Sequence, residues 1–163
     1  MKPVSIISII YGTLGIVWGS LISVLIRFQT SLFSNIPLPD EAISIVDVHK
    51  LFTVLNDTWR LLFPFIFVIG TIYIISGILH LAGRQQYLAL AYIAAILNII
   101  WYLVYMIMIQ TELLPLISLD QFIPKNLFNI LVVVGMVGDA VFYCGYPVFL
   151  IIFLSQQKGG RQG

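Results

Sequence analysis

Long stretches without a charged residue constrain the fold of this chain more than any other feature. They cover residues 3–26, 61–83, 85–111 and, apart from Asp139, 126–157. A transmembrane helix needs about 20 consecutive apolar residues, and each stretch is long enough. The composition agrees, since only 9% of the residues are charged, whereas an ordinary soluble domain has about 25%. We therefore predict one all-α membrane domain over residues 1–163, with spans at 4–26, 61–83, 88–109 and 127–154.

The distribution of charge between the spans predicts the orientation. An even number of spans places both termini on one side, together with the short inner connector 84–87. The charges of that side are all basic, namely Lys2, Arg84, Lys158 and Arg161. The outer loops 27–60 and 110–126 carry as many basic residues but also all the acids outside the spans. Basic residues in short segments favour the cytoplasmic side, so we predict a multi-pass protein of the cell membrane with both termini cytoplasmic.

The first outer loop is expected to be partly helical. Apolar residues recur at helical spacing between Val48 and Leu62. This pattern fits an amphipathic helix lying on the membrane, or an outward extension of the second span. Such a segment either caps the outer end of the protein or offers a surface to a partner. The second outer loop is predicted to fold back onto the membrane surface.

Each span has one face of small and polar residues. Helices in lipid associate through such residues, because lipid tails already satisfy aliphatic surface. At 100° per residue, the shared faces are Ser8, Tyr11, Gly12, Gly15, Gly19 and Ser23; Tyr73, Gly77, His80 and Arg84; Tyr87, Ala91, Ala94, Asn98, Tyr102 and Tyr105; and Gly135, Asp139, Tyr143 and Tyr146. We therefore predict an antiparallel four-helix transmembrane bundle with an aliphatic exterior. Its predicted packing positions are Gly12, Gly15, Gly19, Gly77 and Gly135, which include the Gly15-x-x-x-Gly19 spacing.

Asp139 is the only acidic residue inside a predicted span. A carboxylate at the bilayer centre costs about 2.5–3.5 kcal/mol on insertion scales, so it should face the protein. Asn98 and Tyr73 lie at similar depth, and we expect Asp139 to form a hydrogen bond with one or both. Pro147 cannot donate to the Tyr143 carbonyl and should kink the last span. We predict an intramembrane polar cluster of Asp139, Asn98, Tyr73 and Tyr143 beside this kink.

Two interpretations of Asp139 stay open. In the first, its carboxyl joins helices through hydrogen bonds; in the second, it is a proton or cation site. His80 is the other titratable group that a proton path would use, and it is predicted near the cytoplasmic end, where headgroups or water would satisfy it. Catalysis has little support, because His49, His80 and Cys144 are scattered without metal-ligand spacing. We expect no enzymatic activity, no metal, no cofactor and no nucleic-acid partner.

The layout resembles the membrane-spanning four-domain family of tetraspan proteins, which includes a B-lymphocyte antigen. The likeness rests on a short connector between the second and third spans, a glycine-rich first span, and the stretch Gly70-Thr-Ile-Tyr-Ile-Ile-Ser-Gly-Ile-Leu79. This chain departs from the family in its longer first outer loop and in the absence of cysteines from the second. The resemblance implies an oligomeric, non-enzymatic membrane partner.

The predicted function follows from these features. We expect a small polytopic membrane protein of structural or accessory type, which packs within the lipid bilayer against itself or other membrane proteins. The alternative is a proton- or cation-coupled channel or carrier subunit that uses Asp139.

Overall fold

The computed structural model describes residues 2–33, 48–116 and 124–159. These residues form four long helices: α1 (Lys2–Phe33), α3 (Val48–Leu81), α4 (Tyr87–Met108) and α5 (Lys125–Gly159). A π-helical turn, η1 (Ile109–Leu113), and a 3-10 turn, η2 (Leu114–Leu116), continue α4. Each of the four long helical segments is long and apolar enough to cross a membrane. The predicted all-α fold with four spans is confirmed.

Several helices extend beyond the spans predicted from the charge-free stretches. α1 continues to Phe33, and α3 begins at Val48, so Arg27 and Arg60 lie within helices and are exposed. A charged side chain on the exposed surface of a helix does not end it. With 32 residues, α1 is about 48 Å long, which exceeds the roughly 30 Å hydrocarbon core of a bilayer.

The segment after Val48 is a helical extension of the second span, because α3 is one continuous helix through Pro64. This finding decides between the two interpretations of the helical pattern in the first outer loop. The remainder of that loop, residues 34–47, lies outside the described part of the chain. The same holds for residues 117–123 of the second outer loop.

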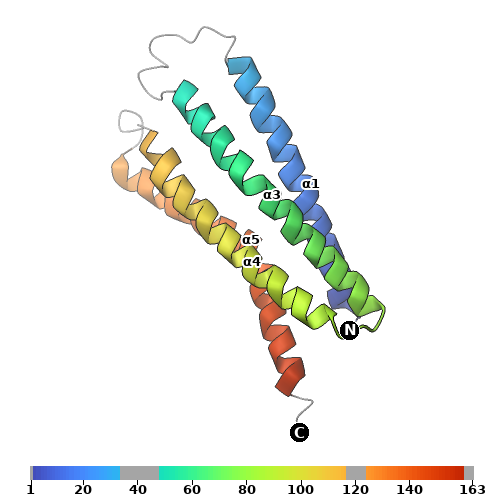
Figure 1. The fold of residues 1–163 in the computed structure, drawn as a ribbon. Helices are drawn as coiled ribbons and strands as arrows, with labels where there is room; N and C mark the ends of the chain where they lie inside the picture. Colours follow the sequence, from blue (N-terminus) through green and yellow to red (C-terminus); the bar gives the residue numbers. More distant parts are fainter. Residues whose placement is uncertain (1, 34–47, 117–123, 160–163) are drawn as a thin grey trace.

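The helices pack in chain order, α1 on α3, α3 on α4, and α4 on α5 (Figure 1). The start of α1, the connector between α3 and α4, and the end of α5 all lie toward the lower end of the bundle in this view. The connector begins with Gly83, whose φ of 70° lies in the left-handed region that glycine adopts readily. Hydrogen bonds from Gly83 to the His80 carbonyl and from Arg84 to the Leu79 carbonyl complete a Schellman-type helix end.

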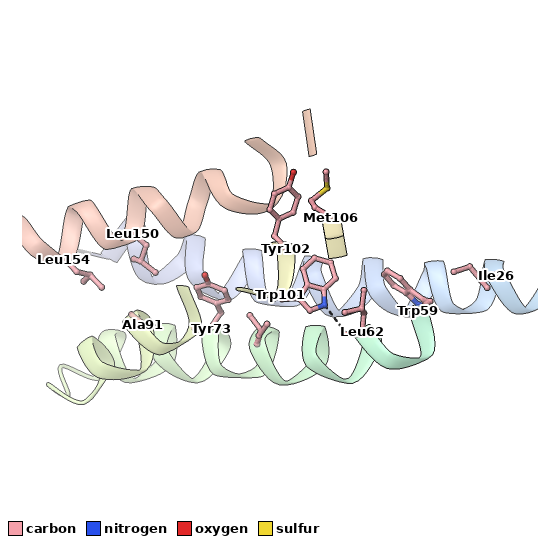
Figure 2. Close-up of a cluster of buried hydrophobic side chains, with 12 residues drawn as sticks. Ile26, Trp59, Leu62, Tyr73, Ala91, Trp101, Tyr102, Met106, Leu150 and Leu154 are labelled. Carbon is pink, nitrogen blue, oxygen red and sulfur yellow. Dashed lines mark hydrogen bonds between the residues drawn. The ribbon is translucent and has the colours of Figure 1, made fainter. Parts of the chain in front are cut away.

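A core of buried side chains runs along the length of the bundle (Figure 2). Tyr73, Leu150 and Leu154 are each 1% exposed. The opposite faces are aliphatic and exposed, as at Ile10, Ile75, Ile100 and Val141. This distribution of exposed aliphatic side chains matches the predicted exterior, which lipid tails cover in a membrane.

Candidate functional site

Pro147 creates the central acceptor of the polar cluster. Proline has no N–H, so the Tyr143 carbonyl four residues earlier lacks its helical donor. Two other helices supply donors to this oxygen: the Asn98 amide of α4 at 2.6 Å and the Tyr11 hydroxyl of α1 at 2.8 Å. The Asn98 amide nitrogen also lies 3.5 Å from the Tyr11 hydroxyl oxygen. One backbone oxygen therefore connects α1, α4 and α5, and α5 changes direction between its two halves (Figure 1).

Three tyrosine rings, those of Tyr11, Tyr73 and Tyr146, pack beside this acceptor. The centroids of Tyr11 and Tyr73 are 5.2 Å apart with the rings nearly perpendicular, and those of Tyr11 and Tyr146 are 4.7 Å apart. The Tyr146 hydroxyl is hydrogen-bonded to the hydroxyl of Ser8. The Tyr73 hydroxyl, in contrast, is buried and has no hydrogen-bond partner among the described residues. A buried polar group left unpaired in this way destabilises a protein by about 1–3 kcal/mol.

Asp139 does not make the predicted hydrogen bonds. The hydroxyl of Tyr73 is unpaired, and the Asn98 amide nitrogen bonds to Tyr143 and Tyr11 instead. The physical reason is the freed Tyr143 carbonyl, an acceptor one turn further along α5 that takes the Asn98 amide. Within the described part of the chain, Asp139 is partly exposed and forms no hydrogen bond or ion pair. Its carboxyl lies within electrostatic reach of three phenols, those of Tyr102, Tyr105 and Tyr143.

Other polar side chains hold neighbouring helices together. The Tyr102 hydroxyl of α4 donates to the Met136 carbonyl of α5 at 2.8 Å. The Trp101 indole nitrogen donates to the Leu62 carbonyl of α3 at 3.2 Å, as Figure 2 shows. These two hydrogen bonds join α4 to α3 and to α5 within the membrane-spanning segments.

His80 has protein partners where we expected headgroups or water. Its Nδ1 atom lies 2.8 Å from the Ser5 hydroxyl oxygen, and its ring stacks on Tyr87 with centroids 3.8 Å apart. Ser5 is buried, so the imidazole is part of the contact among α1, α3 and α4. The expectation that lipid headgroups or water satisfy His80 is therefore wrong for Nδ1.

α1 and α3 approach one another along a glycine seam, which we define as Ser5, Gly12 and Gly19 of α1 facing Gly77, Gly70 and Phe63 of α3. A Cβ atom at Gly77 would lie 2.7 Å from the Ser5 carbonyl oxygen, and one at Gly70 would lie 2.8 Å from that of Gly12. Both sets repeat every seven residues, a spacing that keeps one face of each helix toward its partner. At the pairs Ser5–Gly77 and Gly12–Gly70 the backbones therefore approach one another directly, and a larger side chain there would force the helices apart, whereas Gly19 meets the Phe63 side chain.

Gly15 and Gly135 are not packing positions within the described chain. A Cβ atom at either would meet nothing within 4 Å. The predicted Gly15-x-x-x-Gly19 pair is thus split, since Gly19 faces Phe63 of the seam while Gly15 points into open space. The reason is the seven-residue register of α1 and α3, which places Gly12 and Gly19 in line and turns Gly15 away. Gly70 is not among the predicted packing positions, although its seven-residue distance from Gly77 places both on one face of α3.

A cavity of about 260 Å³ lies among the four helices next to the polar cluster. Gly15 and Gly12 of α1 line it, together with Tyr73 of α3 and Asn98 of α4. Aromatic side chains form much of its remaining wall. Among the described residues, no group of three or more His, Cys, Asp or Glu side chains lies close enough together to hold a metal ion.

Comparisons with protein-family models, curated proteins and solved structures find no match for this chain. The resemblance to the membrane-spanning four-domain family is therefore supported only at the level of architecture. The chain has four long apolar helices, as a tetraspan membrane protein does.

Proposed function

We propose that this four-span membrane protein acts by assembly, as a structural or accessory subunit that packs against itself or other membrane proteins. In this proposal it catalyses no reaction. It lies in the cell membrane with both termini in the cytoplasm. This orientation is supported by the charges of the two termini and of the connector 84–87, which are all basic.

The observation that carries the proposal is that the Asp139 carboxyl is unpaired within the described part of the chain. A carboxyl at this depth is costly to expose to lipid, and the described chain supplies no hydrogen-bond partner for it. The neighbouring Gly135 and Gly138 are exposed, and a Cβ atom at either would meet nothing within 4 Å. Small residues beside an unpaired polar group are the features through which membrane helices associate. A helix of a second subunit could pack against these glycines and donate a hydrogen bond to the Asp139 carboxyl.

The test is the mass of the protein purified in a mild detergent, with identification of any copurified partner. We expect a complex larger than the monomer. Asp139→Leu should weaken association about 3- to 20-fold, the range expected for one interhelical hydrogen bond, because leucine cannot replace the carboxyl. Asp139→Asn should retain most of the association, since an amide still forms hydrogen bonds. Asn129→Leu, an exposed polar position of the same helix, is the matched control. A wild-type protein that is monomeric and copurifies with no partner would refute the proposal.

A second candidate, a proton- or cation-coupled carrier or channel subunit, is favoured by the partial exposure of Asp139 beside three phenols. Reconstitution into liposomes separates the two functions. For a carrier, Asp139→Asn abolishes ion flux, because the amide does not titrate. For an assembly subunit, flux is absent from the wild-type protein as well.

A further inference from the structure

The cavity beside the polar cluster has an almost wholly apolar wall. Tyr73 and Asn98 line it, but the Tyr73 hydroxyl is inaccessible and the Asn98 amide nitrogen already donates to Tyr143 and Tyr11. Aromatic side chains form much of the remaining wall, namely those of Trp18, Trp101, Phe142 and Tyr143. The cavity itself therefore suits an apolar group, and an aromatic ring in particular.

The unpaired carboxyl of Asp139 lies next to this cavity. Asp139 does not line it, but Tyr143, one helical turn further along α5, does so and is within electrostatic reach of the carboxyl. Trp101 of α4 also lines the cavity and stacks on Tyr105, with ring centroids 5.5 Å apart. Tyr105 in turn is within electrostatic reach of Asp139. Two separate sets of contacts, one through α4 and one within α5, thus connect the cavity with the carboxyl.

The surroundings of Asp139 favour an organic cation over a metal ion. A hard metal ion such as Mg²⁺ or Ca²⁺ takes about six or more oxygen ligands, and the described residues contain no group of three His, Cys, Asp or Glu that could hold one. Aromatic rings surround the carboxyl instead. The rings of Tyr102, Tyr105 and Tyr143 lie with their centroids 6.1, 6.2 and 6.5 Å apart. Such rings attract organic ammonium groups, and a carboxylate adds the opposite charge.

The cavity can be reached from the bilayer. Trp18 of α1 and Phe142 of α5 line it and are 48% and 66% exposed, so both side chains also face the membrane. α1 and α5 are not among the closely packed helix pairs. In this region they are joined by the bond from Tyr11 to the Tyr143 carbonyl. A lipophilic molecule can therefore enter sideways between these two helices.

We propose that the cavity and Asp139 together bind a lipophilic aromatic cation, such as an aryl ammonium ion, taken from the bilayer. Its ring occupies the cavity, and its ammonium group lies beside the Asp139 carboxylate. The volume of about 260 Å³ exceeds the roughly 150 Å³ of an apolar cavity that holds benzene, which leaves room for a substituted ring. The inference rests on neither function proposed above, since it concerns binding to one subunit. For the carrier interpretation it names the class of substrate.

A second groove of the molecule lacks the carboxyl. It lies between α3 and α4, has a volume of about 330 Å³, and is lined by aliphatic and aromatic side chains such as Phe65, Ile100 and Trp101. Without a neighbouring charge, this groove suits a hydrocarbon chain. Because Trp101 borders both spaces, a test needs variants that act on the cavity alone.

Tryptophan fluorescence provides the binding assay. The chain has three tryptophans, of which Trp18 and Trp101 line the cavity while Trp59 does not, so a Trp59→Phe background is used. The probe is 4-bromophenyltrimethylammonium, whose bromine quenches tryptophan on contact. The neutral probe 1-bromo-4-tert-butylbenzene has nearly the same shape and lacks the charge. Titrations use the full-length protein in an excess of uncharged micelles, which keeps it monomeric, and the thermal transition of each variant is recorded to check folding.

Two variants, each with a matched control, separate the cavity from the charge. A Cβ atom at Gly15 meets nothing within 4 Å, so the side chain introduced by Gly15→Leu can occupy the cavity without disturbing the glycine seam. Gly145→Leu is its control, because Gly145 is also helical and open but does not line the cavity. Asp139→Asn removes the charge and keeps the shape of the side chain. Its control is Glu112→Gln, which removes a charge from an exposed position away from the cavity.

We expect saturable quenching by the cation that Gly15→Leu abolishes and Gly145→Leu preserves. Asp139→Asn should weaken binding of the cation by at least about tenfold and leave binding of the neutral probe unchanged, because only the cation interacts with the carboxylate. Glu112→Gln should change neither.

Quenching that rises linearly with cation concentration and is equal in all variants would overturn the proposal, because it reports partition into the micelle. An Asp139→Asn protein that binds the cation as tightly as its parent, or loses both probes equally, would also overturn it. The oligomer mass is measured separately in mild detergent, where Asp139→Asn should retain association. A failure of assembly is therefore distinguishable from a failure of binding.

Discussion

Two glycines three residues apart on α1 should respond to alanine in opposite directions. At Gly15 the new methyl group meets nothing within 4 Å. Alanine then stabilises the protein by about 0.4–1 kcal/mol, because it restricts the unfolded chain and favours the helix. At Gly12 the methyl group would overlap the backbone oxygen of Gly70 and lie 3.0 Å from the Cβ atom of Tyr73.

The magnitude at Gly12 follows from these contacts. Backbone atoms of α3 cannot rotate aside as a flexible side chain can, so the two helices must separate. Overpacking of this kind typically destabilises by about 1–3 kcal/mol. Subtracting the alanine gain of about 0.7 kcal/mol from a central value of about 2 kcal/mol leaves a net loss near 1.3 kcal/mol. The two variants should thus differ by about 2 kcal/mol, or roughly 30-fold in the folding equilibrium constant.

The assay is reversible unfolding in mixed micelles with an increasing fraction of sodium dodecyl sulfate, followed by circular dichroism and tryptophan fluorescence. Excess micelles keep the protein monomeric, so contacts between subunits do not contribute. The double variant Gly12→Ala/Gly70→Ala supplies an internal check. Its loss should be smaller than the sum of the single losses, because one separation of the helices accommodates both methyl groups. A Gly12→Ala protein as stable as Gly15→Ala would refute the glycine seam.

Three further predictions concern the hydrogen bonds of α4 and use the same unfolding assay. Asn98→Leu removes the 2.6 Å bond to the Tyr143 carbonyl and should destabilise by about 0.6–2 kcal/mol; an unchanged midpoint would contradict this bond. In a Pro147→Ala background the restored N–H pairs with that carbonyl, so Asn98→Leu should have a smaller effect; full additivity would show that proline does not create the acceptor. Tyr102→Phe removes the 2.8 Å bond to the Met136 carbonyl and should cost about 0.6–1.7 kcal/mol, with no change in helix content by circular dichroism.

The sequence determined the secondary structure and the number of spans. Charge-free stretches of this length must hydrogen-bond their own backbone in lipid, and a helix is how a single segment does so. The same pattern predicted that aliphatic residues such as Ile100 and Val141 lie on the outer surface of the bundle, since aliphatic side chains are exposed to lipid at little cost in free energy. Helix ends were less predictable, because Arg27 and Arg60 sit on exposed helix surface rather than at a terminus.

Only the tertiary structure decided which groups of each face meet. In the sequence, Gly12 and Gly15 are two glycines on the same predicted face of α1. The register of α1 against α3 makes Gly12 the packing position, because its backbone lies opposite Gly70. Likewise, depth and face suggested Asp139 as the partner of Asn98, yet the backbone oxygen freed by Pro147 lies where the amide can reach it. Register and local backbone geometry depend on the summed packing of whole helices. The spans can therefore be predicted from a single sequence, whereas the register of one helix against the next is seen only in the folded bundle.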